Sequence, residues 1–235
     1  MIRISDQETP ARDTVHVWTI DLQQACLDLP ELLSDDEISR FSRISHDKAR
    51  QSFLRSRTSL RLILASYLRC SAAGLLFRYN ENGKPELSSS EPSSLRFNLS
   101  HSGNYCLLAV AADCEIGVDV EQVKSARDYH AVAQRFFTAS EFHLLRNTND
   151  ERLFYRIWVL KEASVKARGM KLLAGLDRFE CTLSEDGELK VTDQRGEDDP
   201  GNWSVRQWQP DTDSIAALVV RSAEVEFVEK NLKNY

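Results

Sequence analysis

The chain has 235 residues, of which 42% are hydrophobic, and it carries a formal charge of −6. This composition predicts a compact globular protein, and the net acidity disfavours nonspecific binding of nucleic acid. No apolar stretch is long enough for a signal-peptide core or a membrane span, so we expect a cytoplasmic protein with no membrane partner. The five cysteines are scattered and odd in number, which favours reduced thiols over a disulfide framework.

The first half of the chain combines short strands with one long basic helix. Alternating side chains over residues 15–20 predict a strand, and Ser34, followed by three acids, predicts a helix start. Residues 47–68 place apolar side chains at helical intervals with arginines opposite them, so we expect an amphipathic helix with an anion-binding side. Further short strands are expected over residues 77–79, 95–99 and 105–111.

The second half begins with a strand at residues 115–120, continues with helices and ends with strands. Helices are expected over residues 129–137, 140–146 and 152–168, the last stopped by Gly169. Strands are expected over residues 179–183, 188–192, 203–208 and 215–220. We therefore predict an α+β fold of two similar α/β halves, residues 1–113 and residues 114–235.

Two acids share one face of the strand predicted at residues 115–120. Because side chains alternate along a strand, Asp119 and Glu121 point to one side and their apolar neighbours to the other, about 7 Å apart at Cα. Paired carboxylates suit Mg²⁺, which prefers oxygen ligands and usually keeps phosphate and water in its shell. An amphipathic strand with its acids in water explains the same pattern, so this pair alone does not establish a metal site.

The long helix at residues 152–168 places charged residues one turn apart. Glu162 and Lys166 share a face, with Trp158 one turn behind them. Glu162 suits a third metal ligand, and Lys166 suits a cation for phosphate. The alternative is an ordinary surface pair worth roughly 0.2–0.5 kcal/mol, with Trp158 in the core.

Ser100 and His101 stand where a predicted strand runs into a turn, a place where functional groups often lie. His101 suits a hydrogen-bond donor to phosphate, although a loop histidine often has no function. The sequence contains no Gly-x-Ser-x-Gly elbow, no Gly-x-x-x-x-Gly-Lys loop and no zinc-ligand spacing.

Five motifs follow one another along the chain: Gly83-Lys84-Pro85; Phe97-Asn98-Leu99-Ser100-His101-Ser102; Gly117-Val118-Asp119-Val120-Glu121; Arg135-Phe136-Phe137 with Glu141; and Trp158-Val159-Leu160-Lys161-Glu162-Ala163-Ser164-Val165-Lys166. In their order and their residues, these motifs resemble those of the 4′-phosphopantetheinyl transferases of the surfactin-activating type. The resemblance spans most of the chain. It departs at Gly169-Met170-Lys171-Leu172-Leu173, where that family often has Gly-x-Gly-Leu.

The resemblance implies a monomer of two halves related by a pseudo-twofold, with coenzyme A and Mg²⁺ bound in the cleft between them. The implied metal ligands are Asp119, Glu121 and Glu162, and the implied phosphate partners are Lys166 and His101. The residues implied to line the nucleotide part of coenzyme A are Lys84, Pro85 and Ser100. Arg40, Arg50 and Arg57 are implied to face the 3′-phosphate, with Arg55 or Arg61 fitting almost as well.

The implied reaction moves the 4′-phosphopantetheine arm of coenzyme A to a serine of an apo acyl or peptidyl carrier protein. Catalytic roles fall to Glu162, Lys166 and His101, with Glu162 as candidate base. Fatty-acid, polyketide and peptide-synthetase carriers are not ranked by the sequence. The candidates for a carrier-docking surface are Lys124, Arg127, Arg135, Phe136 and Phe137, and we expect at least one of these phenylalanines to be core.

Two other functions also accommodate clustered carboxylates and a phosphate-binding cation. One is a coenzyme A binder without turnover, and the other is a Mg²⁺-dependent nucleotide pyrophosphohydrolase. Release of adenosine bisphosphate without a carrier favours the hydrolase, whereas a strict requirement for a carrier serine excludes it.

Overall fold

The computed structural model describes residues 4–88, 94–124, 128–171, 175–196 and 202–232. The helices are α1 (Asp35–Arg43), α2 (Asp47–Leu68), α3 (Tyr129–Phe136), α4 (Ala139–Thr148) and α5 (Glu151–Ala167), with short 3₁₀ turns at Ala25–Leu27, Pro30–Leu32 and Leu176–Arg178. The strands are β1 (Thr14–Asp21), β2 (Phe77–Tyr79), β3 (Pro85–Leu87), β4 (Leu95–Ser102), β5 (Tyr105–Ala112), β6 (Ile116–Gln122), β7 (Phe179–Leu183), β8 (Leu189–Asp193), β9 (Ser204–Trp208), β10 (Ser214–Val220) and β11 (Glu226–Asn231). Within those ranges no helix is long and apolar enough to cross a membrane.

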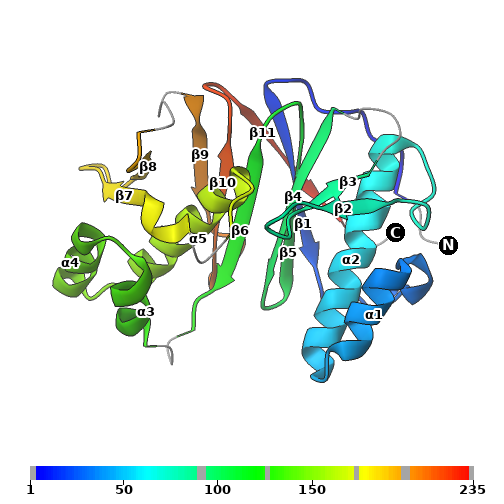
Figure 1. Cartoon of the computed structure of the whole chain (residues 1–235), viewed down its shortest axis with the longest axis horizontal. Helices are drawn as coiled ribbons and strands as arrows, with labels where there is room; N and C mark the ends of the chain where they lie inside the picture. Colours follow the sequence, from blue (N-terminus) through cyan, green and yellow to red (C-terminus); the bar gives the residue numbers. More distant parts are fainter. Residues whose placement is uncertain (1–3, 89–93, 125–127, 172–174, 197–201, 233–235) are drawn as a thin grey trace.

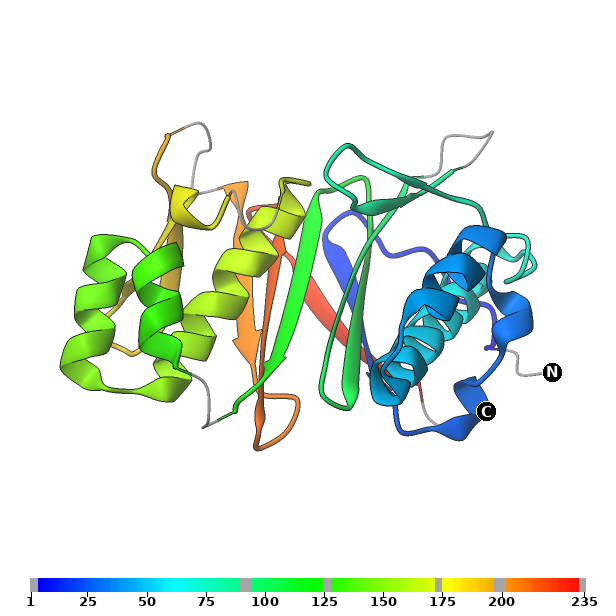
Figure 2. The ribbon, with the colours of Figure 1, turned by 60° about the horizontal axis from the view of Figure 1, so that its bottom comes forward.

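Four layers stack across the molecule in the order helix, sheet, sheet, helix (Figures 1 and 2). The first sheet has the strand order β11-β1-β5-β4, and α2 covers its outer face. The second sheet has the order β6-β10-β9, and α5 covers its outer face. The predicted α+β class is therefore confirmed.

The two sheets pack face to face because alternate residues of their strands are apolar. Val15 and Val17 of β1 meet Ile116, Val118 and Val120 of β6 in a shared core. The intervening residues of each strand point the other way, toward the long helix of their own half. This alternation turns the odd-numbered acids of β6 toward α5 rather than into the core between the sheets.

The two halves have the same topology. In each, a strand leads through helices to a β-hairpin and then to two antiparallel strands, and the sheet orders β1-β5-β4 and β6-β10-β9 correspond. β11 then returns to the first sheet and pairs in parallel with β1, with Thr14 opposite Glu226. Residues 226–231 thus belong to the first sheet although they come from the end of the chain. A boundary between residues 113 and 114 therefore does not separate the two sheets completely. The division into two domains at that boundary stays a prediction.

In the first half a buried ion pair fastens α2 to α1. Ser34 and Glu37 form a capping box at the start of α1, and Arg61 of α2 donates from Nε to Glu37 Oε2 at 2.7 Å. Arg61 is fully buried and also donates to the carbonyls of Ala72 and Leu75. One guanidinium therefore joins two helices to the chain that leads into β2.

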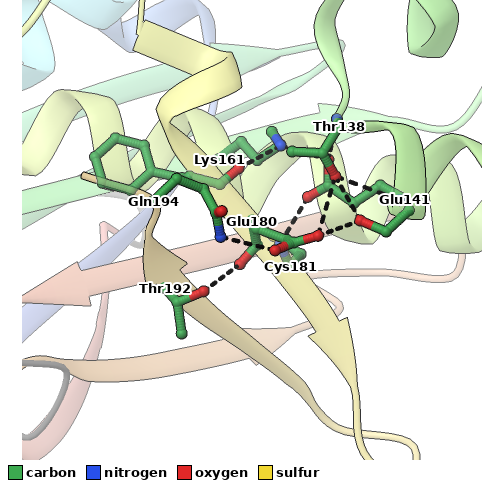
Figure 3. A network of polar contacts seen from close by, with 9 residues as sticks. Thr138, Glu141, Lys161, Glu180, Cys181, Thr192 and Gln194 are labelled. Atoms are coloured by element: carbon green, nitrogen blue, oxygen red, sulfur yellow. Dashed lines mark hydrogen bonds and ion pairs between the residues drawn. The ribbon is translucent and has the colours of Figure 1, made fainter. Parts of the chain in front are cut away.

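The second half uses the same device (Figure 3). Thr138 and Glu141 form a capping box at the start of α4, and Lys161 of α5 donates to Glu141 Oε2 at 2.5 Å. Lys161 is fully buried and also donates to the carbonyl of Phe179, while Glu141 accepts from the amide of Cys181 at 2.6 Å. This pair fixes the position of α5 relative to α4 and β7.

Candidate active site

The edges of the two sheets meet along β4 and β6, where serines donate to the predicted metal-binding acids. Ser100 Oγ donates to Asp119 Oδ1 at 2.7 Å, and Ser102 Oγ donates to Glu121 Oε2 at 2.8 Å. Asn98 contributes a third contact by accepting from the amide of Val118 at 2.8 Å. Asn98 and Ser102 had no role in the sequence-based prediction, although polar residues at every second position of β4 are the signal that identifies them.

A glycine lets α5 lie directly on β6. A Cβ atom built on Gly117 would lie 2.1 Å from the carbonyl oxygen of Ala163 and 2.4 Å from the amide of Ala167. Any side chain at this position would therefore push α5 away from the strand. The close approach brings the last two turns of α5 over the acidic face of β6.

Lys166 is the centre of the resulting cluster of charges. Its Nζ lies 2.5 Å from Asp119 Oδ1, 3.2 Å from Ser100 Oγ and 3.6 Å from Glu162 Oε2. Asp119 and Glu162 are both buried. The structure thus brings together, from β4, β6 and α5, four residues that the family resemblance implies for one cleft.

The carboxylates outnumber the cation, and the pKa values reflect this. Burial and the neighbouring Asp119 raise the pKa of Glu162 to about 8, with a further contribution from Glu121. Burial alone would lower the pKa of Lys166, but Asp119 and Glu162 outweigh it and raise that pKa. Because both Glu162 and Lys166 hold their protons more tightly than usual, the site favours the binding of further positive charge.

Asp119, Glu121 and Glu162 fit a magnesium ion by the chemistry of their donors. In the described part of the chain, no group of three or more His, Cys, Asp or Glu side chains has a geometry that could hold a metal ion. The ammonium of Lys166 lies against Asp119 instead. However, Asp119 Oδ2 is buried and accepts no hydrogen bond, and the remaining donors are carboxylate oxygens, which Mg²⁺ prefers.

His101 and Arg57 form a second group of polar residues beside this cluster. His101 is exposed by its accessible surface, yet partial burial of the imidazole, with Lys166 and Arg57, lowers its pKa. The imidazole is therefore neutral near pH 7 and can donate one N–H. Nη1 of Arg57 is buried and has no hydrogen-bond partner, so it can donate to a bound anion.

Arg40 and Arg50, the other two arginines predicted to face a phosphate, lie in different surroundings. The guanidinium of Arg40 stacks over the ring of Tyr79 at 4.4 Å, and its side chain is exposed. Arg50 pairs with Asp47 at 2.7 Å and is also solvent-exposed. Nothing in these contacts orients either arginine toward His101.

Arg55 and Arg61 fit the arginine spacing equally well, but both serve the fold. Arg55 is buried and makes two hydrogen bonds to the carboxylate of Asp28. Arg61 is committed to Glu37. Sequence spacing does not separate these inward-facing arginines from Arg57, which lies on the same helix.

Lys84 and Pro85 border a cavity of about 980 Å³ beside the C-terminal end of α5. Nζ of Lys84 donates to the carbonyls of Ile116 at 3.0 Å and Lys166 at 2.7 Å, and burial lowers its pKa to about 8. The side chains around the cavity include cations, acids and amides, among them Arg78, Asn80, Asn82, Glu86, Arg96 and Arg168.

The predicted docking residues divide between surface and core. Phe137 is buried and stacks on Phe154, which confirms the expectation that at least one phenylalanine is core. Phe136 is half-buried and meets Trp158 edge to face, while Lys124 is exposed. Arg127 and the segment Leu172-Leu173 lie outside the described residues.

Comparison with known proteins assigns the chain to a family. Residues 115–220 match the family described as "4'-phosphopantetheinyl transferase superfamily", and residues 18–113 match "4'-phosphopantetheinyl transferase, N-terminal". The chain is 37% identical over 215 residues to the 4'-phosphopantetheinyl transferase HetI of a Nostoc species, covering 88% of each protein. It is 31% identical over 166 residues to the 4'-phosphopantetheinyl transferase ffp of Bacillus subtilis, covering 69% of this chain and 72% of that protein.

A solved structure titled as Helicobacter pylori holo-[acyl-carrier-protein] synthase in complex with coenzyme A gives a TM-score of 0.36 at 19% identity, covering 46% of this chain and 99% of that chain. This likeness adds nothing to the assignment, which follows from the two family matches and from the identity to HetI over most of both chains. The chain therefore belongs to the 4′-phosphopantetheinyl transferase superfamily.

Proposed function

We propose that this protein transfers the 4′-phosphopantetheine arm of coenzyme A to a serine hydroxyl of an apo carrier protein and releases adenosine 3′,5′-bisphosphate. The observation that carries the proposal is the meeting of Ser100, Asp119, Glu162 and Lys166 in a family with this activity. Three carboxylates and one lysine ammonium suit a pyrophosphate substrate bound with a divalent ion.

Asp119, Glu121 and Glu162 would hold Mg²⁺, which when bound supplies positive charge to the phosphoryl oxygens. Lys166 pairs with Asp119 in the free protein and would turn its ammonium to the pyrophosphate of coenzyme A. His101, neutral near pH 7, would donate one N–H to a phosphate oxygen. Each of these groups stabilises negative charge, which is the main demand of phosphoryl transfer.

In the proposed step, the carrier serine oxygen forms a bond to the phosphorus that bears the pantetheine arm. The bond from that phosphorus to the oxygen of the adenosine-linked phosphate breaks, and this oxygen leaves with the bond's electron pair. The serine proton has to be accepted by a base, and Glu162 is our candidate because its pKa, raised to about 8, lies near the working pH, as suits a general base.

We assign the nucleotide end of coenzyme A to the cavity bordered by Lys84 and Pro85, next to the end of α5. Ser100, implied by the resemblance to contact the same part of coenzyme A, donates to Asp119. Among the candidate arginines we favour Arg57 for the 3′-phosphate, because its Nη1 is buried without a partner and its charge acts on His101. Arg40 and Arg50 remain weaker candidates.

The carrier would approach from the side of α3, where exposed Lys124 and Arg135 and half-buried Phe136 offer positive and apolar surface. Reversal of the charge at Lys124 should raise the KM for the carrier and leave the KM for coenzyme A unchanged. Equal KM values for the carrier before and after the change would remove this surface from the proposal. Function as a monomer in the cytoplasm stays a prediction.

Intact-mass spectrometry of a purified apo carrier tests the reaction. The carrier is incubated with the protein, coenzyme A and Mg²⁺, beside a reaction that contains Asp119→Asn. We expect the carrier to gain one phosphopantetheine mass with the unchanged protein alone. No gain with acyl and peptidyl carriers would favour a coenzyme A binder without turnover.

A reaction without carrier separates transfer from hydrolysis. Adenosine 3′,5′-bisphosphate should form only when a carrier serine is present, because that hydroxyl is the nucleophile. Release of the bisphosphate in the absence of carrier would instead identify a nucleotide pyrophosphohydrolase.

A further inference from the structure

A turn of the first half, residues 80–84, closes over the C-terminal end of α5 in the second half. Asn80 and Asn82 each donate from Nδ2 to the carbonyl of Gly169, at 3.2 and 2.8 Å. Lys84 Nζ donates to the carbonyl of Lys166 at 2.7 Å. Three side chains of one half thus bind backbone oxygens at the end of a helix in the other.

The end of α5 has a chemical need for such donors. The last carbonyls of a helix lack partners within it, and the partial negative charge there favours a cation. The amides of Gly169 and Met170 satisfy part of this need by donating back to Lys166 and Val165. Gly169 has φ +62°, and a Cβ there would lie 3.1 Å from Asn80 Nδ2, so the 80–84 turn packs directly on this cap.

The 80–84 turn is held in shape by its own hydrogen bonds. Asn80 Oδ1 accepts from the amides of Asn82 at 3.0 Å and Lys84 at 2.9 Å, and the amide of Asn80 donates to the carbonyl of Lys84. Lys84 Nζ also donates to the carbonyl of Ile116, the first residue of β6. One ammonium therefore ties the end of α5 to the start of the strand that carries the acids.

We propose that the 80–84 turn is a positioning element for the transfer: it fixes the last turn of α5, and with it the ammonium of Lys166, against the acids of β6. The inference rests on the proposed function for the identity of the reaction. Lys84 acts here through Lys166 rather than on the substrate. Burial lowers the pKa of Lys84, as expected for a cation kept from solvent to serve two carbonyls.

The other role for Lys84 is direct contact with coenzyme A, which the family resemblance implies. The two roles differ in what they predict for the ligand-free protein. A positioning role makes the last turn of α5 depend on Lys84 before any ligand binds. A purely ligand-binding role leaves that turn unchanged until coenzyme A is added.

Amide hydrogen exchange of the ligand-free protein tests the positioning role. Lys84→Met keeps the approximate length of the side chain but removes its hydrogen-bond donors. Asn82→Ala removes one exposed donor and serves as the second variant in case Lys84→Met folds poorly. We expect the amides at residues 165–170 to exchange about tenfold faster in both variants. Lys190→Met, at an exposed lysine of β8, is the matched control and should leave this exchange unchanged. Unchanged exchange in Lys84→Met would overturn the proposal.

Steady-state kinetics give a second readout. We expect Lys84→Met to lower kcat about tenfold while the KM for coenzyme A stays within about twofold, and Lys84→Arg to recover part of the loss. A raised KM with unchanged kcat would assign Lys84 to coenzyme A instead. If the unchanged protein modifies no carrier, the proposed function fails, and the exchange experiment still decides whether the turn holds α5 in place.

Discussion

The two halves share a topology and a buried ion pair, yet they differ on one strand face. Where β1 turns Trp18 and Ile20 toward α2, β6 turns Asp119 and Glu121 toward α5. The first arrangement extends an apolar core, and the second creates a cluster of charge. The same scaffold thus holds an apolar interface in one half and the candidate site in the other, according to which side chains face the long helix.

The hydrogen bonding at the two interfaces differs in the same sense. In the first half, the hydroxyl of Tyr67 accepts from Trp18 Nε1 at 2.9 Å and lies 2.7 Å from His16 Nδ1. In the second half, one oxygen of Asp119 has no hydrogen bond, and Glu162 has a pKa of about 8. Groups left unsatisfied in this way are common where a protein binds or transforms a ligand.

The largest effect that we expect is on the buried ion pairs that the halves have in common. Arg61→Met and Lys161→Met should each lower the free energy of unfolding by about 3–5 kcal/mol, because each leaves a buried carboxylate without its partner. Urea unfolding measures this. Arg221→Met, which breaks an exposed pair with Glu115, should cost less than about 1 kcal/mol.

The structural correspondence between the two buried ion pairs would not extend to their energetics if one of them contributed little to stability. A cost below about 1 kcal/mol for either methionine variant would show that the two pairs are not the same device. Lys161→Met should also slow transfer, since α5 carries Glu162 and Lys166, whereas Arg61→Met should affect transfer less.

A second test replaces one side chain that faces the long helix in each half, Asp119 on β6 and Trp18 on β1. Asp119→Asn should lower kcat/KM by about 10²–10³-fold, because it removes charge from the proposed magnesium site. Trp18→Phe removes a buried hydrogen bond to Tyr67 and leaves a small cavity, so it should cost about 1–3 kcal/mol of stability and leave kcat/KM within about threefold. Carrier modification followed by mass spectrometry, and urea unfolding, measure the two effects. Equal loss of activity in both variants would remove the functional distinction between the strands.

A third, smaller effect concerns Glu162 in the absence of metal. Its pKa is raised to about 8 in the folded state against about 4.5 when unfolded, so the folded protein binds the proton more tightly and loses stability as pH rises between these values. Glu162→Gln removes this dependence and should raise stability at pH 8 by about 1–2 kcal/mol in the presence of a chelator. Thermal unfolding at pH 5 and pH 8 tests this. A variant less stable than the wild type at pH 8 would show that the carboxylate is not under strain.

Much of this architecture follows from periodicity in the sequence. Alternation over residues 116–121 predicts both the strand and the shared face of Asp119 and Glu121, and helical spacing predicts the pairing of Glu162 with Lys166. These are local relations within one element, so a single sequence contains them. The meeting of the two groups required the family resemblance, because spacing does not state which strand lies under which helix.

Long-range relations were the part that periodicity did not reveal. β11 was not predicted, because its side chains alternate weakly and its pairing partner lies more than two hundred residues earlier. The roles of the arginines on α2 depend on acids elsewhere in the chain, Asp28 and Glu37, that face only some of them. Likewise, spacing does not reveal that the ammonium of Lys84 reaches carbonyls of the opposite half, and its contact with the nucleotide stays a prediction.

The smallest effect distinguishes the neutral interface of the first half from the charged interface of the second. Burial and Lys230 lower the pKa of His16 to about 4, against about 6.5 in an unfolded chain. As pH falls from 6.5 to 4, the unfolded state gains a proton that the folded state resists, so His16 costs stability over this window. His16→Asn removes that cost. The difference in Tm between the wild type and His16→Asn should therefore be a few degrees less favourable to the wild type at pH 4.5 than at pH 7. The effect is small because the imidazole is only half-buried. NMR titration of the imidazole provides a direct check, and a midpoint near 6.5 would mean that burial and Lys230 do not hold His16 neutral.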